Sequence, residues 1–264
     1  MSEDAPVLFD ATRSGVAVIT LNRPATRNAL NPDVIARLSE IVEELKGADG
    51  VRVVLVEGAG ENFSAGPDPE WLRFSADYTH ADDLADGRGF ARLLHRLRHL
   101  PMPTVALVDG QATGSAVGLV AACDIVLATS GARFALDEVR RGVLPAVASP
   151  YVGERVGLGA LRRLALTGAA ISAEEAARLG LVDELVADRA ALAAASERLV
   201  SGIFESAPGA VAEMKDLIGR LAHMPLDAKL EQEVARAHAD ARAKGEAKEG
   251  LAALMEARRP RWAE

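Results

Sequence analysis

A turn of small residues with a proline at its centre, FSAGPDPEW at residues 63–71, is the first stretch of this chain that could do chemistry. Such a turn between a strand and a helix often presents backbone N–H groups to the oxygen atoms of a ligand. Pro67 has no N–H to donate. The stretch is therefore either a binding turn that lacks one donor or a turn that serves only the fold. Proline also restricts the preceding residue, so we expect Gly66 to be extended.

A second candidate is the glycine-rich segment at residues 110–124, in which Gly110, Gly114 and Gly118 are spaced by four. Backbone donors at the start of a helix would be its functional use. Taken alone, the spacing favours a helix that packs closely against a neighbour. The GxGxxG and GxxxxGK[ST] phosphate-binding motifs are absent, and Ser115 is not in a GxSxG motif, which disfavours a serine hydrolase.

Titratable residues supply further candidates, most of which have a simple structural interpretation. Asp137 and Glu138, taken alone, indicate a solvated acidic pair that faces Arg140 and Arg141.

His95 and His99 have the i, i+4 spacing of some zinc ligands, but no HExxH glutamate or third ligand is near them in the sequence. A helix face is the favoured interpretation. Cys123 lies in an apolar run and is expected to be a core residue. We therefore predict no metal site.

Composition limits the classes of function. The chain has 264 residues, 49% hydrophobic and 26% charged, with a net charge of −8. No basic stripe offsets this charge, so nucleic acid is not an expected partner. One cysteine excludes an intrachain disulfide, and the start, MSEDAPVLFD, has no signal-peptide pattern. No apolar run is long enough for a membrane span. We expect a cytoplasmic protein.

The elements that must position these residues alternate between strand and helix in the first part of the chain. Four β-rich runs predict strands: residues 15–22, 51–58, 103–110 and 125–129, with a shorter one at 132–136. Apolar spacing predicts a helix over 33–46, where Val34, Leu38, Ile41, Val42 and Leu45 share one face. Asp68 followed by Pro69 is typical of a helix start. Residues 72–89 are polar and predict an irregular, mobile loop, and a helix is expected over 89–100.

From about residue 153 the pattern is helical, with a helix capped by Ser172 and Glu175 and breaks expected at Pro208 and Pro225. Strands that alternate with helices and are followed by helices indicate the α/β class with a helical C-terminal part. We place the boundary between residues 187 and 188.

Together these pieces resemble the crotonase superfamily, which comprises the enoyl-CoA hydratases and isomerases. The resemblance runs from about Val7 to Trp262, and its order and spacing make it specific. DPEW and VGLVAACD followed by LPAVASPYV are most similar to hydratases of methylglutaconyl-CoA and isohexenylglutaconyl-CoA. The resemblance to the superfamily rests on the segments LNRPATRNAL, FSAGPD, PTVALVDGQATGSAVGLVAACDIVLA, FALDEVRRGVLP, LTGAAISAEEAARLGLVDELV and KEGLAALMEARRPRW.

The resemblance implies a spiral of ββα units with a C-terminal helical region that forms trimers, often paired into hexamers. It also implies a CoA thioester whose carbonyl lies in a hole formed by two backbone N–H groups. By position these donors would be Ser115 and residue 67, where Pro67 has no N–H. Of two glutamates in the common hydratases, one falls on Gly118 and is missing, and the other falls on Glu138.

The family's nucleotide-lining stretches, as the resemblance implies, fall on Arg27, on the turn Ser64, Ala65, Gly66 and Asp68, and on Gly114. Coenzyme A would enter as part of the substrate, so no separate cofactor is expected.

Three functions remain open at this point. The leading hypothesis is a hydratase of a branched or carboxylated enoyl-CoA, in which Glu138 passes one proton on in both half-steps. A decarboxylase or isomerase of an acyl thioester is the second. A non-catalytic acyl-CoA-binding or structural subunit is the third, which Pro67 and Gly118 favour and Glu138 disfavours.

Overall fold

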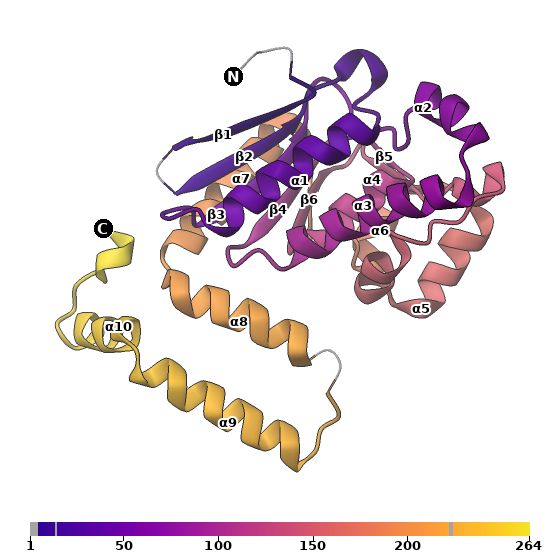
Figure 1. Ribbon diagram of the computed structural model, residues 1–264. Helices are drawn as coiled ribbons and strands as arrows, with labels where there is room; N and C mark the ends of the chain where they lie inside the picture. Colours follow the sequence, from indigo (N-terminus) through magenta and orange to yellow (C-terminus); the bar gives the residue numbers. More distant parts are fainter. Residues whose placement is uncertain (1–4, 14, 222–223) are drawn as a thin grey trace.

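A mostly parallel sheet forms the centre of the fold (Figure 1). The computed structural model describes residues 5–13, 15–221 and 224–264. Residues 1–4, on which part of the expectation about a signal peptide rests, lie outside the described residues. Within these ranges the sheet has six strands, and only β1 and β2 pair antiparallel. In sheet order they are β1 (Val7–Arg13), β2 (Val16–Leu21), β3 (Val53–Gly58), β4 (Thr104–Val108), β6 (Ile125–Thr129) and β9 (Glu184–Val186).

The runs predicted as strands form β2, β3, β4, β6 and β7, so those predictions are confirmed. Strands inside a parallel sheet are covered on both faces, which is why all of β4 is apolar or small and buried. A second, smaller sheet carries the glycine-rich segment. It consists of β5 (Gln111–Thr113), β7 (Arg133–Ala135) and β8 (Ile171–Ser172).

Helices cover both faces of the main sheet. α1 (Pro32–Lys46), α3 (His80–Arg98) and α4 (Ser115–Ala122) lie on one face, and α7 (Arg189–Phe204) lies behind the sheet in Figure 1. Two separate apolar clusters result, because successive strand residues point to opposite faces. Val54 belongs to the larger cluster with α1, whereas Val53 belongs to the smaller one with α7. The five apolar residues predicted for the buried face of α1 are all buried.

Residues 72–89 are not an irregular loop, so this prediction is wrong. α2 (Pro69–Phe74) and η2 (Ser75–Asp77) come first, and α3 then begins at His80. Thr79 and Asp82 close a reciprocal capping box at its start. The first half of α3 is mostly exposed and polar. The buried residues of this helix, Leu93, Leu94 and Leu97, all lie near its C-terminal end. Apolar periodicity therefore could not reveal its beginning.

The middle of the chain adds short helices around the small sheet. The predicted cap is confirmed, since Glu175 N donates to Ser172 Oγ at 3.2 Å and α6 (Ala173–Leu179) follows. α5 (Ser149–Thr167) changes direction at Gly157, whose φ is +74°. The remaining short helices are η1 (Pro24–Thr26) and η3 (Glu138–Arg141).

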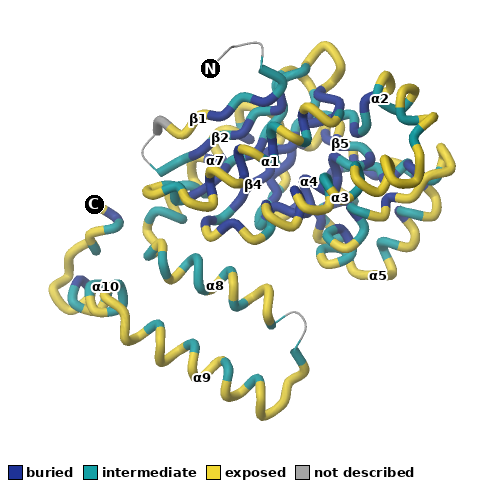
Figure 2. The backbone as a smooth tube through the Cα atoms, viewed as in Figure 1, coloured by how far each residue is buried: buried dark blue, intermediate teal, exposed yellow. Residues whose placement is uncertain are grey.

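Beyond α7 the chain leaves the core as an extended arm (Figures 1 and 2). We call residues 208–264 the C-terminal arm. No residue of α8 or α9 is buried within the part of the arm that the structure describes. α7 lies beyond residue 187 but packs on the sheet. The expected breaks at Pro208 and Pro225 are confirmed. The elements of the arm are α8 (Pro208–Leu221), α9 (Ala228–Ala243), α10 (Gly245–Met255) and η4 (Arg261–Ala263).

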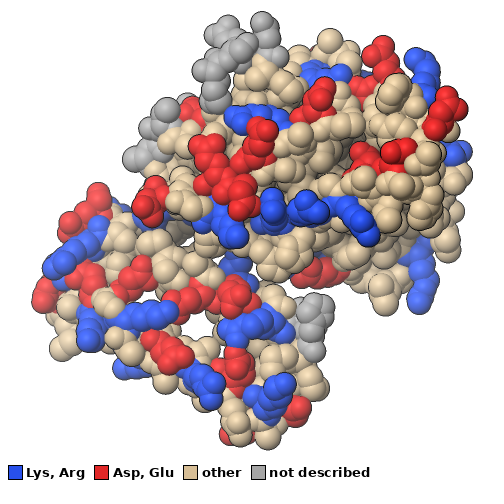
Figure 3. Space-filling model, in the orientation of Figure 1, with Lys and Arg blue, Asp and Glu red and all other residues tan. Residues whose placement is uncertain are grey.

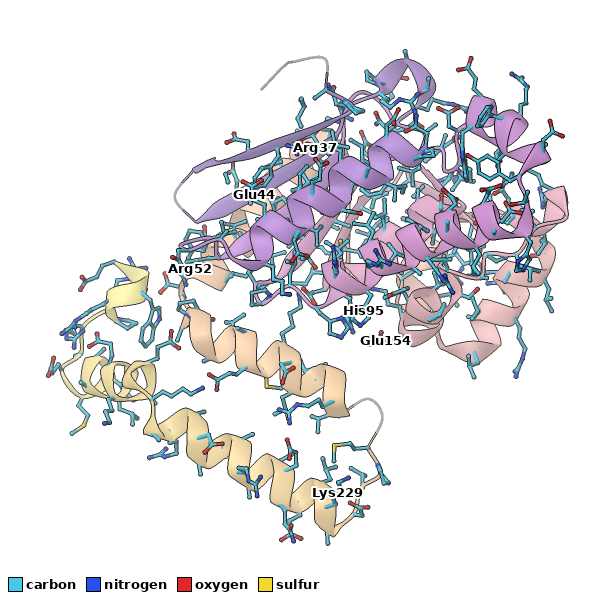
Figure 4. All side chains as sticks on the ribbon, viewed as in Figure 1. Arg37, Glu44, Arg52, His95, Glu154 and Lys229 are labelled. Carbon is cyan, nitrogen blue, oxygen red and sulfur yellow. The ribbon has the colours of Figure 1, made fainter. Side chains whose placement is uncertain are left out.

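Two basic side chains fasten the arm to the core. Arg52, labelled in Figure 4, lies at the joint and donates to the carbonyl oxygens of Trp262 at 2.6 Å and Ser206 at 2.7 Å. Lys215 of α8 lies with its Nζ 2.6 Å from Asp124 Oδ2. Hydrogen bonds and an ion pair therefore hold the base of the arm against the core.

Charges of both signs alternate over the arm on the face seen in Figure 3. Its ion pairs include Arg220 with Glu233 and Lys244 with Glu213. Across the described ranges, none of the helices combines the length and the apolarity that crossing a bilayer requires.

Candidate active site

The turn at residues 63–71 is built around a glycine that no other residue could replace. Gly66 has φ +81°, and a Cβ there would lie 2.3 Å from the carbonyl oxygen of Thr113. The expected extended conformation of Gly66 is therefore wrong, because the close approach to the neighbouring strand requires positive φ. Leu30 N donates to Gly66 O and Asp68 N donates to Leu30 O, both at 2.8 Å. These bonds place Pro67 at a fixed position.

Ser64 is fully buried and serves the turn itself. Its hydroxyl donates to the carbonyl of Asn28 at 2.7 Å and accepts from Gly66 N at 3.2 Å. Ala65 N donates to the carbonyl of Arg27 at 2.8 Å. The Arg27 residue is exposed and left-handed, with φ 54°. The structure thus brings the predicted nucleotide-lining residues together, with Arg27 at the surface.

Asp68 is also occupied within the turn. One of its carboxylate oxygens accepts from the backbone N–H groups of Glu70 and Trp71, which confirms it as the cap of α2. The other lies 2.7 Å from Arg23 Nη1. Burial alone would raise the pKa of Asp68, but the bond from Arg23 and the two backbone donors outweigh it and lower this pKa. The charged carboxylate of Asp68 therefore stabilises the turn through its bonds to Arg23 and to the start of α2.

Pro67, Gly114 and Glu138 meet at one point. A Cβ built on Gly114 would lie 3.1 Å from Pro67 Cδ and 3.2 Å from Glu138 Oε1. Gly114 has φ 57° and ψ −127° and immediately precedes α4. Because Ser115 is the first residue of α4, its N–H has no intrahelical acceptor. Three segments that are distant in sequence therefore place a backbone donor, a proline ring and a carboxyl group side by side.

Glu138 is buried, with only 7% of its surface exposed. Its Oε2 is one of the buried side-chain atoms that have no hydrogen-bond partner within the described ranges. Burial raises the pKa of this carboxyl group, and the charge of Asp137 adds to the effect. The expected solvated acidic pair is therefore correct for Asp137 and wrong for Glu138. The two carboxylate oxygens of Asp137 accept from the Arg141 guanidinium at 2.7 and 2.9 Å, whereas Glu138 faces inward.

Gly118 faces a slot that other side chains fill. A Cβ at this position would lie 3.0 Å from Ala148 Cβ and 3.1 Å from Leu94 Cδ1. The close-packing interpretation of the glycine spacing is therefore correct at Gly118. A larger side chain at Gly118 would therefore require Leu94 or Ala148 to move.

Other candidates remain outside the site. Cys123 is buried in the core as expected, and burial raises the pKa of its thiol to about 12. His95, in the last turn of α3, and His99, which directly follows this helix, stack on each other with ring centroids 4.3 Å apart. Throughout the described ranges, no group of three His, Cys, Asp or Glu side chains could hold a metal ion.

Sequence reasoning did not assign a role to two residues beside the site. Arg23 pairs with Asp68, and Trp71 of α2 has a buried indole nitrogen without a partner. The motif DPEW contained Trp71, but only three-dimensional burial could reveal its unpaired N–H.

Comparison with known proteins places this chain in a family. The family model described as enoyl-CoA hydratase/isomerase matches residues 11–264. A short-chain-enoyl-CoA hydratase of Clostridium acetobutylicum is 33% identical over 81% of this chain and 82% of its own. An (E)-benzylidenesuccinyl-CoA hydratase of Thauera aromatica is 32% identical over 84% of this chain and 85% of its own.

Solved structures agree. An enoyl-CoA hydratase from Shewanella pealeana superposes with a TM-score of 0.93 at 33% identity and covers 97% of this chain and 96% of its own. AtuE of Pseudomonas aeruginosa also has a TM-score of 0.93, at 34% identity, over 98% of this chain and 100% of its own. The chain therefore has the crotonase fold and is an enzyme of the enoyl-CoA hydratase/isomerase family.

Proposed function

We propose that this enzyme adds water to, or removes it from, a branched or carboxylated enoyl-CoA. The observation that carries the proposal is the buried carboxyl group of Glu138, which has one oxygen, Oε1, beside the start of α4 and the other, Oε2, without a hydrogen-bond partner within the described ranges. In the proposed complex the thioester oxygen accepts from the N–H of Ser115. A preorganised donor at that place stabilises the negative charge that develops on this oxygen.

Glu138 would transfer the protons. As a carboxylate it removes a proton from the attacking water, and as the resulting acid it delivers that proton to Cα of the enolate. Burial raises its pKa toward the working pH, which favours a group that must act both as acid and as base. One carboxyl group is sufficient if the proton it receives is the proton it donates.

Two observations support a branched or carboxylated acyl group. Gly118 is closed by Leu94 and Ala148, which leaves the single-glutamate pattern that the resemblance to branched-glutaconyl hydratases implies. The Thauera relative is named for a benzylidenesuccinyl thioester. Arg27, exposed beside the turn, would bind the phosphates of CoA, and Ser64, Ala65, Gly66 and Gly114 would shape the wall along which the thioester lies.

An isomerase or decarboxylase is the second candidate. A single buried proton-transfer group at Glu138 suits protonation of an enolate that is formed without water. A relative 29% identical to this chain is named 1,2-epoxyphenylacetyl-CoA isomerase, from Escherichia coli.

We also propose a homotrimer or a dimer of trimers, located in the cytoplasm. The arm supports the assembly, because it carries large apolar side chains at the surface that a monomer would leave in water. They include Met214, Ile218, Leu226, Leu251, Leu254 and Met255.

A product analysis tests the activity. The enzyme is incubated with simple, branched and carboxylated enoyl-CoA thioesters, and the products are weighed by mass spectrometry. A gain of one water on a branched or carboxylated thioester supports the proposal. Loss of carbon dioxide, or a shifted double bond without a change in mass, selects the second candidate. Unchanged thioesters across the panel would contradict both.

A further inference from the structure

Glu138 lies in a single short turn between two side chains of opposite charge. η3 runs from Glu138 to Arg141, and Asp137 is the residue before it. Within this described turn the Asp137 carboxylate makes no cap bond to a backbone N–H. Its Oδ2 instead accepts from Arg141 Nη1 at 2.7 Å and its Oδ1 from Arg141 Nη2 at 2.9 Å. The pair therefore closes the turn from its start to its last residue.

These bonds fix the place of the Glu138 carboxyl group. Two parallel N–H···O bonds set orientation as well as distance, because the planar guanidinium matches the carboxylate. A second arginine of the turn, Arg140, donates from its Nε to the carbonyl of Thr167 at 3.3 Å and ties η3 to the end of α5. Since Glu138 Oε1 lies only 3.2 Å from the place of a Cβ on Gly114, a small movement of the turn would displace it from the start of α4.

The pair also places two opposite charges beside Glu138. Burial raises the pKa of Glu138, the negative charge of Asp137 raises it further, and the positive charge of Arg141 lowers it. The neighbouring elements are nearly free of charge within the described ranges. α4 has no charged residue, the buried residues of α5 are apolar, and Asp68, next to Pro67, is paired with Arg23.

A different use of Arg141 would be to bind a carboxylate of the substrate. Its guanidinium already donates to both oxygens of Asp137, so the two parallel bonds that a carboxylate would need are formed within the protein. A carboxylated acyl group would have to displace Asp137. The geometry therefore favours a role toward Glu138.

We propose that Asp137 and Arg141 form a positioning pair for Glu138. Their bidentate bond holds the turn that carries this carboxyl group, and their opposite charges offset each other beside it. The inference rests on the proposed function, in which Glu138 transfers the proton. The effect of the pair on Glu138 can nevertheless be measured without substrate.

The pH profile of hydration separates charge from shape. Glu138 must be ionised to take a proton from water, so kcat/KM falls on the acid side of its pKa. Asp137→Asn removes the negative charge, and this acid limb should move to lower pH. Arg141→Met removes the positive charge, and the limb should move to higher pH. A merely structural role would not move the limb in opposite directions.

Arg141→Lys separates geometry from charge. It keeps the positive charge, but an ammonium group cannot form the two parallel bonds. We expect the acid limb to stay near its wild-type pH and the plateau kcat to fall by about tenfold, part of the roughly 10²-fold that a misplaced group can cost. The exchange variant Asp137→Arg/Arg141→Asp restores an ion pair across the turn and should regain most of that loss.

Glu40→Gln on α1 is the matched control. It neutralises one partner of a surface ion pair outside the site, in which Arg37 Nη1 lies 2.9 Å from Glu40 Oε2. Neither the acid limb nor the plateau should change. If Asp137→Asn or Arg141→Met does not fold, Arg141→Lys and the exchange variant, which both keep two charged partners, test the positioning role by the plateau kcat.

A direct titration of Glu138 distinguishes this inference from the proposed function. The carboxyl group is followed by ¹³C NMR in substrate-free protein with labelled glutamate, and its signal is assigned by its loss in Glu138→Gln. Its pKa should fall in Asp137→Asn and rise in Arg141→Met.

An unmoved pKa, or a shift of the same sign in both variants, would overturn the inference. So would a wild-type plateau in Arg141→Lys, or a loss confined to the KM of carboxylated thioesters, which would assign Arg141 to the substrate. Opposite shifts of the Glu138 titration without turnover of any enoyl-CoA would leave the pair's effect on Glu138 in place and contradict the proposed function alone.

Discussion

The site and the C-terminal arm differ in the kind of group that lacks a partner: polar atoms at the site and apolar side chains on the arm. In the segments that form the site, Glu138 Oε2 and Trp71 Nε1 are buried without partners within the described ranges. On the arm the charged groups form ion pairs, such as Arg258 with Glu249 at 2.6 Å, while large apolar side chains such as Leu254 are exposed. An unused buried polar atom indicates a small polar ligand. An uncovered apolar surface indicates another protein chain.

The largest expected effect is on turnover, at the site. Glu138→Gln should lower the kcat by about 10²–10⁴-fold, because it removes the proton-transfer group and keeps the shape. Steady-state kinetics on the true substrate checks this. Full turnover in the variant would show that another group transfers the proton.

The same substitution has a pH-dependent effect on stability. Because the pKa of Glu138 is raised in the folded state, the folded protein holds this proton more tightly than the unfolded chain. The contribution of this bound proton to the free energy of unfolding is complete at low pH. It is lost as the pH rises from about 4.5, the ordinary pKa of a glutamate, through the raised pKa of the folded state. Denaturant unfolding should therefore show Glu138→Gln gaining stability over the wild type across that interval. A difference that is constant with pH would contradict the burial of this group.

The next largest effect concerns the arm. Leu254→Glu places a charge among the exposed apolar residues, where Leu254 itself is 76% exposed. If this surface is an interface, self-association should weaken by about 30-fold or more, since a central interface residue contributes about 2 kcal/mol or more. Sedimentation equilibrium measures the change.

The control for the arm is Lys229→Glu, a charge change at an exposed position of α9 outside the apolar group. It should leave the assembly intact. A wild-type protein that sediments as a monomer at micromolar concentration would refute the proposed trimer.

Packing at Gly118 gives a smaller effect. Gly118→Ala should destabilise the fold by about 1–3 kcal/mol, because the new methyl group meets Ala148 and Leu94 at the distances of an overpacked core. Ala148→Gly should relieve part of that loss. The control is Gly219→Ala on α8, where no atom lies within 4 Å of the new methyl group and helix propensity predicts a gain of about 0.5–1 kcal/mol. Equal denaturation midpoints for all variants would show that the slot is open.

The smallest effect is expected at Pro67. Pro67→Ala adds a backbone donor to a site that, in our proposed function, already has the N–H of Ser115. We therefore expect the kcat on a simple enoyl-CoA to rise by about tenfold, which is less than a full donor contributes. An unchanged, fast wild-type rate would mean that residue 67 does not face the thioester oxygen.

Strands and buried helix faces were predictable from the sequence because their apolar residues recur with the period of the element. The caps at Asp68 and Ser172 were predictable because their chemistry is local. The start of α3 was not, since its exposed half carries no apolar period. The positive φ of Gly66 was missed because the nearby Thr113 carbonyl, and not the following proline, determines it.

The site itself was only partly predictable. The resemblance selected Glu138, Ser115 and Pro67, whereas the residues alone favoured a solvated acidic pair. Burial of Glu138 depends on η3 packing against the start of α4, which is a long-range contact. The unpaired nitrogen of Trp71 is likewise a property of the fold, because an isolated segment would expose it to water.

Turnover in D₂O tests the central claim, that Glu138 delivers a proton to Cα, most directly. Hydration of the true enoyl-CoA by the wild type should place one deuterium on Cα of the product, as read by NMR or by mass after exchangeable sites are washed out. The Glu138→Gln variant should show no such incorporation above the uncatalysed rate. Incorporation at the wild-type rate in Glu138→Gln would contradict the account.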